Sequence, residues 1–287
     1  MNILITGAAG QLGRAMVKAS QGSDNKYIFC DRQNLDITDE VAVESFVLAQ
    51  RIDVIVNCAS YTAVDKAEDE QDAADLVNNK AVAAMAEIAR KHDAVLIHIS
   101  TDYVFDGKAC TAYTEDAPTA PLNVYGRTKA DAERAIVESG CRHIILRTSW
   151  LYGAEGDNFV KRIIEKSAEN PVLRVISDQI GTPTFVEDLA GLISLIIEEN
   201  MLDRTGIYNY SNEGVCSWYD FAHEICAQVG HLCDVLPCHT DEYPRKAARP
   251  HFSVLDKTKV KNTFGIEIPH WKDSLSLCIR ELENIEE

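Results

Sequence analysis

The feature that most constrains the fold is a glycine-rich turn near the start of the sequence. An apolar run over residues 3–6 leads directly into Gly7-Ala-Ala-Gly10-Gln-Leu-Gly13, and a helical pattern follows. Glycines at this spacing let the backbone amides at a helix N-terminus approach a pyrophosphate closely. A glycine pattern alone is weak evidence, but a strand before it and a helix after it are the context that this turn requires. The segment therefore predicts dinucleotide binding.

The first half of the chain alternates between short β-rich runs and longer helical stretches. The predicted strands are residues 3–6, 27–30, 54–57, 95–100 and 143–147, and the predicted helices are 10–20, 39–49, 70–92 and 123–138. This rhythm is typical of βαβ units, which build a parallel sheet covered by helices on both faces.

Beyond Trp150, prolines interrupt shorter elements, which favours a smaller α+β lobe. We expect an α/β fold with a Rossmann-type doubly wound parallel sheet. The NAD(P)-binding domain is predicted over residues 1–150, with a return segment over 157–177. Residues 178–287 are predicted to form a substrate-binding domain, and the cleft between two such lobes is the expected site.

Charge and cysteine content narrow the class of partners. The chain has 28 Lys and Arg against 45 Asp and Glu, a net charge of −17, which disfavours nucleic acid and anionic membranes. No segment approaches the ~20 apolar residues that cross a bilayer, and no basic residues precede the first apolar run. Nine cysteines at irregular spacing favour free thiols. We expect a cytoplasmic protein, monomeric or homodimeric, that binds a small molecule.

Three polar side chains suggest a catalytic site. Tyr125 and Lys129 stand four residues apart in a predicted helix and so share one face of it. Thr101 follows a predicted strand, at the carboxyl end where parallel sheets place their sites. A free tyrosine has a pKa of about 10, which a nearby cation lowers by about 1–3 units. We therefore expect Tyr125 to donate a proton, Lys129 to lower its pKa and hold the nicotinamide ribose, and Thr101 to orient a carbonyl.

Two adjacent residues, Asp31 and Arg32, favour different cofactors. Asp31 ends the second predicted strand, where a carboxylate binds the adenosine ribose hydroxyls of NAD. Arg32 beside it is suited to the 2′-phosphate of NADP. The sequence leaves NADH and NADPH both open, and we predict that both are used.

These motifs and several others resemble the extended short-chain dehydrogenase/reductase family. The segments that carry the resemblance are Gly7–Gly13, Ser100-Thr-Asp-Tyr-Val-Phe-Asp-Gly107, Pro121-Leu-Asn-Val-Tyr-Gly-Arg-Thr-Lys129, Arg147-Thr-Ser-Trp-Leu-Tyr-Gly153, Ser177-Asp-Gln-Ile-Gly-Thr-Pro-Thr184 and Ala248-Arg-Pro-His-Phe-Ser253. The first and third are family-wide, whereas the others are similar to members that reduce nucleotide-linked keto sugars. The resemblance implies NAD(P)H-dependent reduction of the 4-keto group of dTDP-4-dehydro-L-rhamnose to dTDP-L-rhamnose, a step toward cell-surface polysaccharide.

The resemblance also implies roles for individual residues. Thr101, Tyr125 and Lys129 are catalytic, and the sugar nucleotide contacts Thr101, Asp102 and Trp150. The cofactor is lined by Gly10, Gln11, Leu12, Asp36, Ile37, Ser60, Tyr61 and Thr62, in addition to Gly7, Gly13, Asp31, Arg32, Tyr125 and Lys129. We add Arg249 as a phosphate ligand, because Pro250 stiffens the backbone beside it and a guanidinium grips phosphate bidentately. Alternatively, cations in this loop only balance Asp241 and Glu242.

Other activities remain alternatives. A 4,6-dehydratase of the same family has a second acid after Thr101-Asp102, where this chain has Tyr103. A 4-epimerase or another sugar-nucleotide reductase uses the same three residues and stays open. A non-catalytic protein similar to the regulatory β subunit of methionine adenosyltransferase retains the Tyr-Gly-x-Thr-Lys run.

We expect no metal site. Some family members dimerise around Mg²⁺ through a glutamate just after the glycine turn, where this chain has Arg14-Ala15-Met16, although Glu187 could match another ligand. His231, Cys233, Cys238 and His239 match no common zinc spacing.

Overall fold

The Val- and Ile-rich runs of the first half form one parallel sheet in the computed structural model, which describes residues 1–286. The sheet has six strands in the order β10-β5-β4-β3-β1-β2. Its strands are β1 (Asn2–Thr6), β2 (Lys26–Cys30), β3 (Val54–Asn57), β4 (Val95–Thr101), β5 (Arg142–Thr148) and β10 (Gly206–Asn209). The order reverses at β1, which pairs with both β2 and β3. The predicted doubly wound α/β fold is confirmed, and its carboxyl edge is where such sheets bind ligands.

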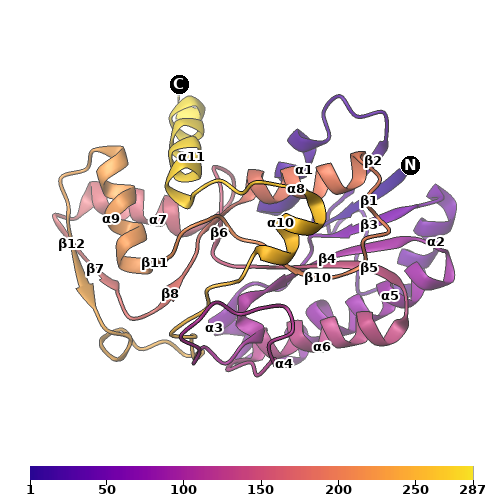
Figure 1. Cartoon of the computed structure of the whole chain (residues 1–287), viewed down its shortest axis with the longest axis horizontal. Helices are drawn as coiled ribbons and strands as arrows, with labels where there is room; N and C mark the ends of the chain where they lie inside the picture. Colours follow the sequence, from indigo (N-terminus) through magenta and orange to yellow (C-terminus); the bar gives the residue numbers. More distant parts are fainter. Residues whose placement is uncertain (287) are drawn as a thin grey trace.

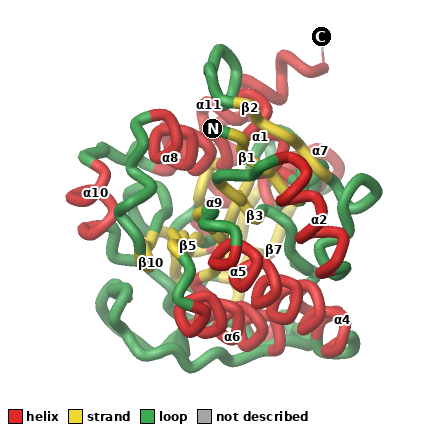
Figure 2. Tube along the Cα trace, turned by 90° about the vertical axis from the view of Figure 1, so that its right-hand side faces the viewer, coloured by secondary structure: helices red, strands yellow, loops and turns green. Residues whose placement is uncertain are grey.

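Helices cover both faces of this sheet (Figure 2). On one face lie α1 (Gln11–Ala19) and α8 (Val186–Glu198), and on the other lie α2 (Glu40–Gln50), α5 (Ala81–Lys91) and α6 (Val124–Ser139). The predicted helix over 70–92 consists of α4 (Gln71–Asp75), a π-helical turn η1 (Leu76–Lys80) and α5. Because both faces are covered, the central strands are apolar along almost their whole length.

A second lobe lies at the carboxyl edge, on the left of Figure 1. It contains α7 (Phe159–Glu169), α9 (Trp218–Val229), α11 (Trp271–Glu286) and the parallel pair β7 (Val172–Ile176) and β12 (Asp234–Cys238). Its core is aromatic, with Phe221 against Tyr152 and Trp271. Short strands join the lobes: β6 (Leu151–Tyr152) pairs with β9 (Thr184–Phe185), and β8 (Ile180–Gly181) pairs with β11 (Cys216–Ser217). The remaining elements are α3 (Val64–Ala67), η2 (Asp102–Val104), η3 (Thr240–Glu242) and α10 (Thr258–Phe264).

The chain returns to the main sheet later than expected. The predicted return segment, 157–177, forms α7 and β7 of the second lobe, where Val160 and Ile163 pack into the aromatic core. The segment that returns is α8 with β10, because the apolar face of α8 packs beside α1 and β10 pairs with β5. The boundaries 1–150 and 178–287 stay a prediction.

Two further features concern the cysteine thiols and the apolar character of the helices. All nine cysteines lie within the described residues and are free thiols. Across residues 1–286, no helix combines the length and the apolar character that a membrane crossing demands.

Candidate active site

The glycine turn is shaped by close backbone approaches. Gly7 has a φ of +65°, and a Cβ on it would lie 2.6 Å from the backbone nitrogen of Ala59. A Cβ on Gly13 would lie 2.4 Å from the carbonyl oxygen of Gly7. Helix α1 starts after Gly10, with no side-chain cap and no acidic residue in its first turn. The first turn of α1 therefore has neither a capping side chain nor an acidic residue that would compete with a pyrophosphate for its backbone amides.

Gln11 and Leu12, at the start of α1, have different surroundings. The side chain of Leu12 is buried in the core, so only its backbone is available to a cofactor. Oε1 of Gln11 accepts a hydrogen bond from Nδ2 of Asn158 at 3.1 Å, which ties the turn to the loop before α7.

Asp31 and Arg32, which follow β2, differ in their hydrogen bonds and in their exposure to solvent. Oδ1 of Asp31 accepts hydrogen bonds from the backbone N–H of Gln33 and Asn34, at 2.9 and 3.1 Å. The side chain of Arg32 is 87% exposed, and its Nε lies 3.5 Å from Oδ2 of Asp36. The carboxylate of Asp31 thus accepts hydrogen bonds from the backbone of the turn that follows it, whereas the side chain of Arg32 is exposed to solvent.

Asp36 and Ile37 follow in the same loop. Hydrogen bonds from the backbone N–H and the hydroxyl of Thr38 hold the pKa of Asp36 below its ordinary value. Ile37 is buried in the core beneath α2. Its backbone, not its side chain, is the part available at the sheet edge.

The segment after β3 is held by Asn78, a residue that sequence reasoning missed. Oδ1 of Asn78 accepts hydrogen bonds from Oγ of Ser60 at 2.9 Å and from the backbone N–H of Tyr61 at 2.7 Å. Its Nδ2 donates to Oγ1 of Thr128 at 3.2 Å. Asn78 lies in the π-helical turn η1, and such turns are frequent at functional sites. Thr62, the next predicted cofactor residue, lines the cleft described below.

Thr101, Asp102 and Tyr125 meet at the carboxyl end of β4. Oγ1 of Thr101 donates to Oδ1 of Asp102 at 3.0 Å and accepts from the backbone N–H of Tyr103 at 3.2 Å. Oδ2 of Asp102 is buried and has no hydrogen-bond partner among the described residues. Burial raises the pKa of Asp102 to about 7, while hydrogen bonds from Ser253 and Thr101 act the other way. Asp102 is therefore an unusually basic carboxylate that lies buried beneath the edge of the sheet.

The electrostatics of Tyr125 differ from the expectation. Burial raises the pKa of Tyr125 to about 12, a hydrogen bond from Thr101 lowers it, and the charge of Asp102 raises it. Lys129 does not contribute to this shift, and its predicted lowering of the Tyr125 pKa stays a prediction. Nζ of Lys129 donates to the carbonyl oxygen of Ile99 at 2.5 Å and lies 3.1 Å from Nε2 of His98.

A buried ion pair fixes α6 against the sheet. Nη2 of Arg147, on β5, lies 2.7 Å from Oε2 of Glu133, on α6, and both side chains are buried. Oγ of Ser100 donates to the same carboxylate at 2.5 Å. Because Glu133 lies one turn after Lys129 on α6, this pair sets the position of the helix that carries Tyr125 and Lys129.

A cleft of about 570 Å³ lies between the lobes. Its walls are Thr62–Lys66 near α3, Tyr103, the face of α7 and the strand β7. Five cationic side chains of the second lobe line it: Arg162, Lys166, Arg174, Arg245 and Arg249. The net charge is −17, yet this cavity gathers positive charge, which suits an anionic ligand.

Trp150, a predicted substrate contact, is covered by another tryptophan. Its φ is +48°, an uncommon conformation for a bulky residue, and its ring stacks on Trp218 with centroids 3.6 Å apart. Trp218 packs in turn against Phe159 and lines the cleft. No local pattern in the sequence pointed to Trp218, because the stack joins segments far apart in the chain.

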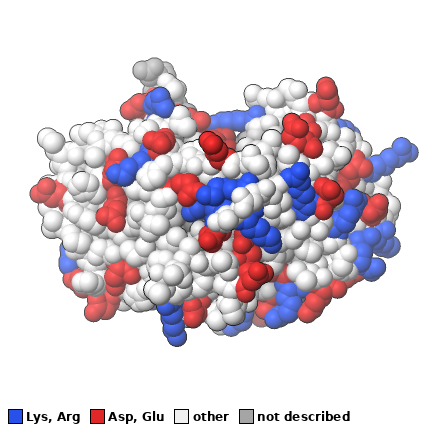
Figure 3. Space-filling view, viewed as in Figure 1, with Lys and Arg blue, Asp and Glu red and all other residues white. Residues whose placement is uncertain are grey.

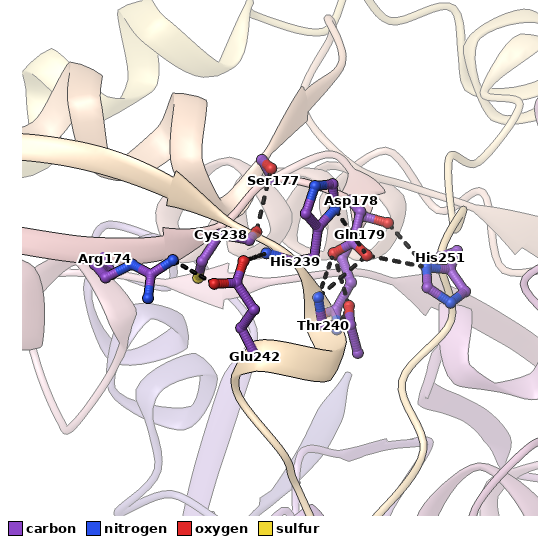
Figure 4. Close-up of polar contacts among 9 residues, drawn as sticks. All are labelled: Arg174, Ser177, Asp178, Gln179, Cys238, His239, Thr240, Glu242 and His251. Carbon is purple, nitrogen blue, oxygen red and sulfur yellow. Dashed lines mark hydrogen bonds and ion pairs between the residues drawn. The ribbon is translucent and has the colours of Figure 1, made fainter.

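Arg249 lies in the loop after β12, which polar contacts fasten at its base (Figure 4). Oδ1 of Asp178 accepts from Oγ1 of Thr240 at 2.7 Å, and Arg174 pairs with Glu242. The loop then crosses to α3, where Nη2 of Arg249 lies 3.0 Å from Oδ2 of Asp65.

The partners of this loop are not those considered from the sequence. Arg249 pairs with Asp65 and Lys246 pairs with Asp69, so the idea that the loop cations balance Asp241 and Glu242 is wrong for both. The Arg249 side chain is only 16% exposed and lies over the ring of Tyr103. It therefore belongs to the cleft wall.

Charges elsewhere on the surface are mixed. Figure 3 shows lysines and arginines near the middle of one face, over α10 and its neighbours, with acidic side chains close by. At the positions compared with Mg²⁺-binding relatives, Arg14 pairs with Glu155, and Glu187 pairs with Lys18. Among residues 1–286, no group of three or more His, Cys, Asp or Glu side chains has a geometry that holds a metal ion.

The sheet order and the glycine turn define a Rossmann-type dinucleotide-binding fold with a second lobe. Residues 1–284 match the family model described as RmlD substrate binding domain. A dTDP-4-dehydrorhamnose reductase of Aggregatibacter actinomycetemcomitans is 40% identical over 283 residues, covering 95% of this chain and 96% of the relative. The chain therefore belongs to the RmlD substrate-binding-domain family, within the extended short-chain dehydrogenase/reductases predicted above.

Two solved structures are similar over almost the whole chain. A dTDP-4-dehydrorhamnose reductase from Clostridium acetobutylicum has a TM-score of 0.95 and 41% identity, and 99% of this chain covers 100% of it. The enzyme of that name from Bacillus anthracis, solved in complex with NADP, has a TM-score of 0.93 and 36% identity, with coverage of 98% and 99%.

Proposed function

We propose that this chain is an NAD(P)H-dependent reductase that converts dTDP-4-dehydro-L-rhamnose to dTDP-L-rhamnose. The observation that carries the proposal is similarity to dTDP-4-dehydrorhamnose reductases at 40% identity over nearly the full length. Thr101, Asp102 and Tyr125 meeting beside a cationic cleft support it. The nine free thiols support a reducing compartment such as the cytoplasm.

The cofactor is proposed to bind at the glycine turn. The close approaches at Gly7 and Gly13 and the open first turn of α1 fit its pyrophosphate. Ser60, Tyr61 and Thr62 are proposed to line the nicotinamide half. When bound, the reduced nicotinamide supplies a hydride. Exposed Arg32 favours a 2′-phosphate, and the NADP complex of the Bacillus anthracis relative supports that choice.

Thr101 and Tyr125 are proposed to act on the oxygen of the keto group. Reduction of a ketone adds a hydride at carbon and a proton at oxygen, so a proton donor must face that oxygen. Because burial raises its pKa to about 12, the Tyr125 phenol is protonated near neutrality and holds the proton that this step requires. The Thr101 hydroxyl is proposed to orient the carbonyl beside it, by exchanging its hydrogen bond to Oδ1 of Asp102 for one to the keto oxygen.

The cleft cations are proposed to bind the diphosphate of the substrate. Arg249 is the leading candidate because its side chain is mostly buried in the cleft wall, lies over the ring of Tyr103 and pairs with the carboxylate of Asp65. Trp218, stacked on Trp150, offers an aromatic face to the base or the sugar. Burial between lobes would strengthen each of these interactions.

The direct test is to incubate the protein with dTDP-4-dehydro-L-rhamnose and NADPH or NADH. We expect one oxidised cofactor per dTDP-L-rhamnose formed, measured by absorbance and by chromatography of the sugar nucleotide. An epimerase would change the sugar without net cofactor consumption, and a regulatory subunit would bind without turnover. Either result would overturn the proposal.

A further inference from the structure

A carboxylate of the first lobe holds the cationic loop of the second. Asp65 lies in α3 and lines the cleft, and three groups of the loop at residues 239–251 face it. Oδ1 of Asp65 accepts a hydrogen bond from the backbone N–H of Ala247 at 3.0 Å. Oδ2 lies 3.0 Å from Nη2 of Arg249 and 4.0 Å from Nη1 of Arg245. The proposed function uses the cations of this loop but gives Asp65 no role.

The guanidinium of Arg249 is fixed by two hydrogen bonds and an aromatic ring. Nη2 donates to Oδ2 of Asp65 at 3.0 Å, and Nη1 donates to the carbonyl oxygen of Ala247 at 3.2 Å. Cζ of Arg249 lies 5.9 Å from the centre of the Tyr103 ring. Because the group is planar and its donors form a rigid fork, bonds at two of its nitrogens define its orientation.

The same contacts leave part of the guanidinium for a ligand. An arginine side chain has five N–H donors, and those of Arg249 make two hydrogen bonds within residues 1–286. The other three are left for an anion in the cleft that Arg249 lines. A phosphate can therefore bind Arg249 while Asp65 stays in place.

We propose that Asp65 is a positioning residue for the substrate: it holds the Arg249 guanidinium in the orientation that receives the diphosphate of the sugar nucleotide. The inference rests on the proposed function for the identity of this ligand. A long side chain loses rotational freedom when it binds a ligand, and one that is already fixed loses less. Asp65 then strengthens the binding of a phosphate although both are anions.

The charges around Asp65 keep its repulsion of a phosphate small. Arg249 and Arg245 both lie within 4.0 Å of its carboxylate, and their positive charges offset it. The next cation on α3, Lys66, pairs with Glu70 at 2.9 Å. The neighbouring carboxylate of Asp69 pairs with Lys246 of the loop. The carboxylates on this wall are thus paired with cations.

Two other roles for Asp65 predict different effects on the affinity for a diphosphate. If the Asp65 carboxylate occupied the position of the phosphate, its removal would tighten binding. If Asp65 only fastened the loop through Ala247, its removal would weaken binding whether or not Arg249 is present. A positioning role weakens binding only while Arg249 is there to be oriented.

The experiment measures the Kd of dTDP by isothermal titration calorimetry in the wild type, Asp65→Asn, Arg249→Ala and the double variant. Asparagine keeps the size of the side chain and an oxygen for the N–H of Ala247, but it loses the charge that orients the guanidinium. We expect Asp65→Asn to raise the Kd about 3–10-fold. In the Arg249→Ala background the same change should alter the Kd by less than about 1.5-fold.

The matched control is Asp69→Asn. It removes a neighbouring negative charge and the pair with Lys246, but Asp69 does not line the cleft. We expect it to change the Kd of dTDP by less than about twofold, as for other exposed ion pairs. Urea denaturation checks that each variant is folded.

Steady-state kinetics give a second readout. Asp65→Asn should raise KM for the sugar nucleotide by the same factor as the Kd of dTDP and leave kcat unchanged, because binding is lost equally in the ground state and the transition state. Tighter or unchanged dTDP binding in Asp65→Asn, an equal loss in the Arg249→Ala background, or no binding to the wild type would overturn the inference. The expected pattern of dTDP affinities without turnover of dTDP-4-dehydro-L-rhamnose would overturn the proposed function alone.

Discussion

The carboxyl edge of the sheet, with Thr101, Tyr125 and Lys129, differs in structure from the loop at residues 239–251. Thr101 and Lys129 are buried, and regular elements, β4 and α6, hold them in place. Arg245, Lys246 and Arg249 lie on an irregular segment that ion pairs connect to Asp65 of α3 and to Asp69 just after it. Proton transfer requires positions fixed within tenths of an ångström, whereas attraction of a phosphate falls off slowly with distance. The difference teaches that rigid elements carry the proposed chemistry and a charged loop carries the proposed recognition.

The largest expected effect falls on the catalytic edge. Tyr125→Phe removes the proposed proton donor but keeps the ring, which packs edge-on against Tyr103 with centroids 5.9 Å apart. We expect turnover to fall by about 10²–10⁴-fold, the usual contribution of a positioned acid. Steady-state kinetics measure the fall, and fluorescence titration with NADPH should show nearly unchanged binding. Turnover within a few fold of wild type would remove the phenol from the mechanism.

The second prediction compares a buried ion pair with an exposed one. Glu133→Ala leaves Arg147 charged and unpaired in the interior, so the free energy of unfolding should fall by about 3–5 kcal/mol. Glu155→Ala, which breaks the exposed pair with Arg14, should cost at most about 1 kcal/mol. Urea denaturation of both variants provides the comparison. Similar losses would show that burial does not distinguish the two pairs.

The third prediction tests the loop. Arg249→Ala should raise KM for the sugar nucleotide at least about tenfold, a loss of about 1.4 kcal/mol, without changing the affinity for NADPH. Lys246→Ala is the matched control, because Lys246 pairs with Asp69 and is not among the residues that line the cleft. The effect of Arg249→Ala should shrink as salt screens the charge. An unchanged KM at low ionic strength would exclude Arg249 from phosphate binding.

The smallest expected effect concerns the cofactor. Arg32→Ala should weaken NADPH by about 3–10-fold and NADH little, because only NADPH has a 2′-phosphate for the guanidinium to bind. We expect the wild-type chain to use both cofactors with less than about tenfold preference. The carboxylate of Asp31 accepts two backbone hydrogen bonds, which should weaken its repulsion of the 2′-phosphate. Affinities for each cofactor, measured in parallel, test this. An equal loss for both would mean that Arg32 faces away from the cofactor.

Local sequence signals predict the first five strands and the longer helices between them, but not the short helices α3 and η2. Short apolar runs and the glycine turn depend on residues close in the chain, so a strand such as β3 (Val54–Asn57) matches its predicted range. The site at the carboxyl edge followed from the same rhythm, because parallel strands must end on the same side of a sheet. The sequence therefore places Thr101, at the end of β4, on the same edge as the glycine turn that follows β1.

What only the tertiary structure decided are pairings between distant segments. Four contacts join residues far apart in sequence: the pairing of β10 with β5, the Trp150–Trp218 stack, the Arg249–Asp65 pair and the contact of His98 with Lys129. A periodic pattern reports which face of an element is apolar, but not which of several apolar faces it meets. The buried contact between Nδ1 of His98 on β4 and Nδ2 of Asn57 on β3 exists only because these two strands pair, so this network is set by the assembled sheet and not by any residue alone.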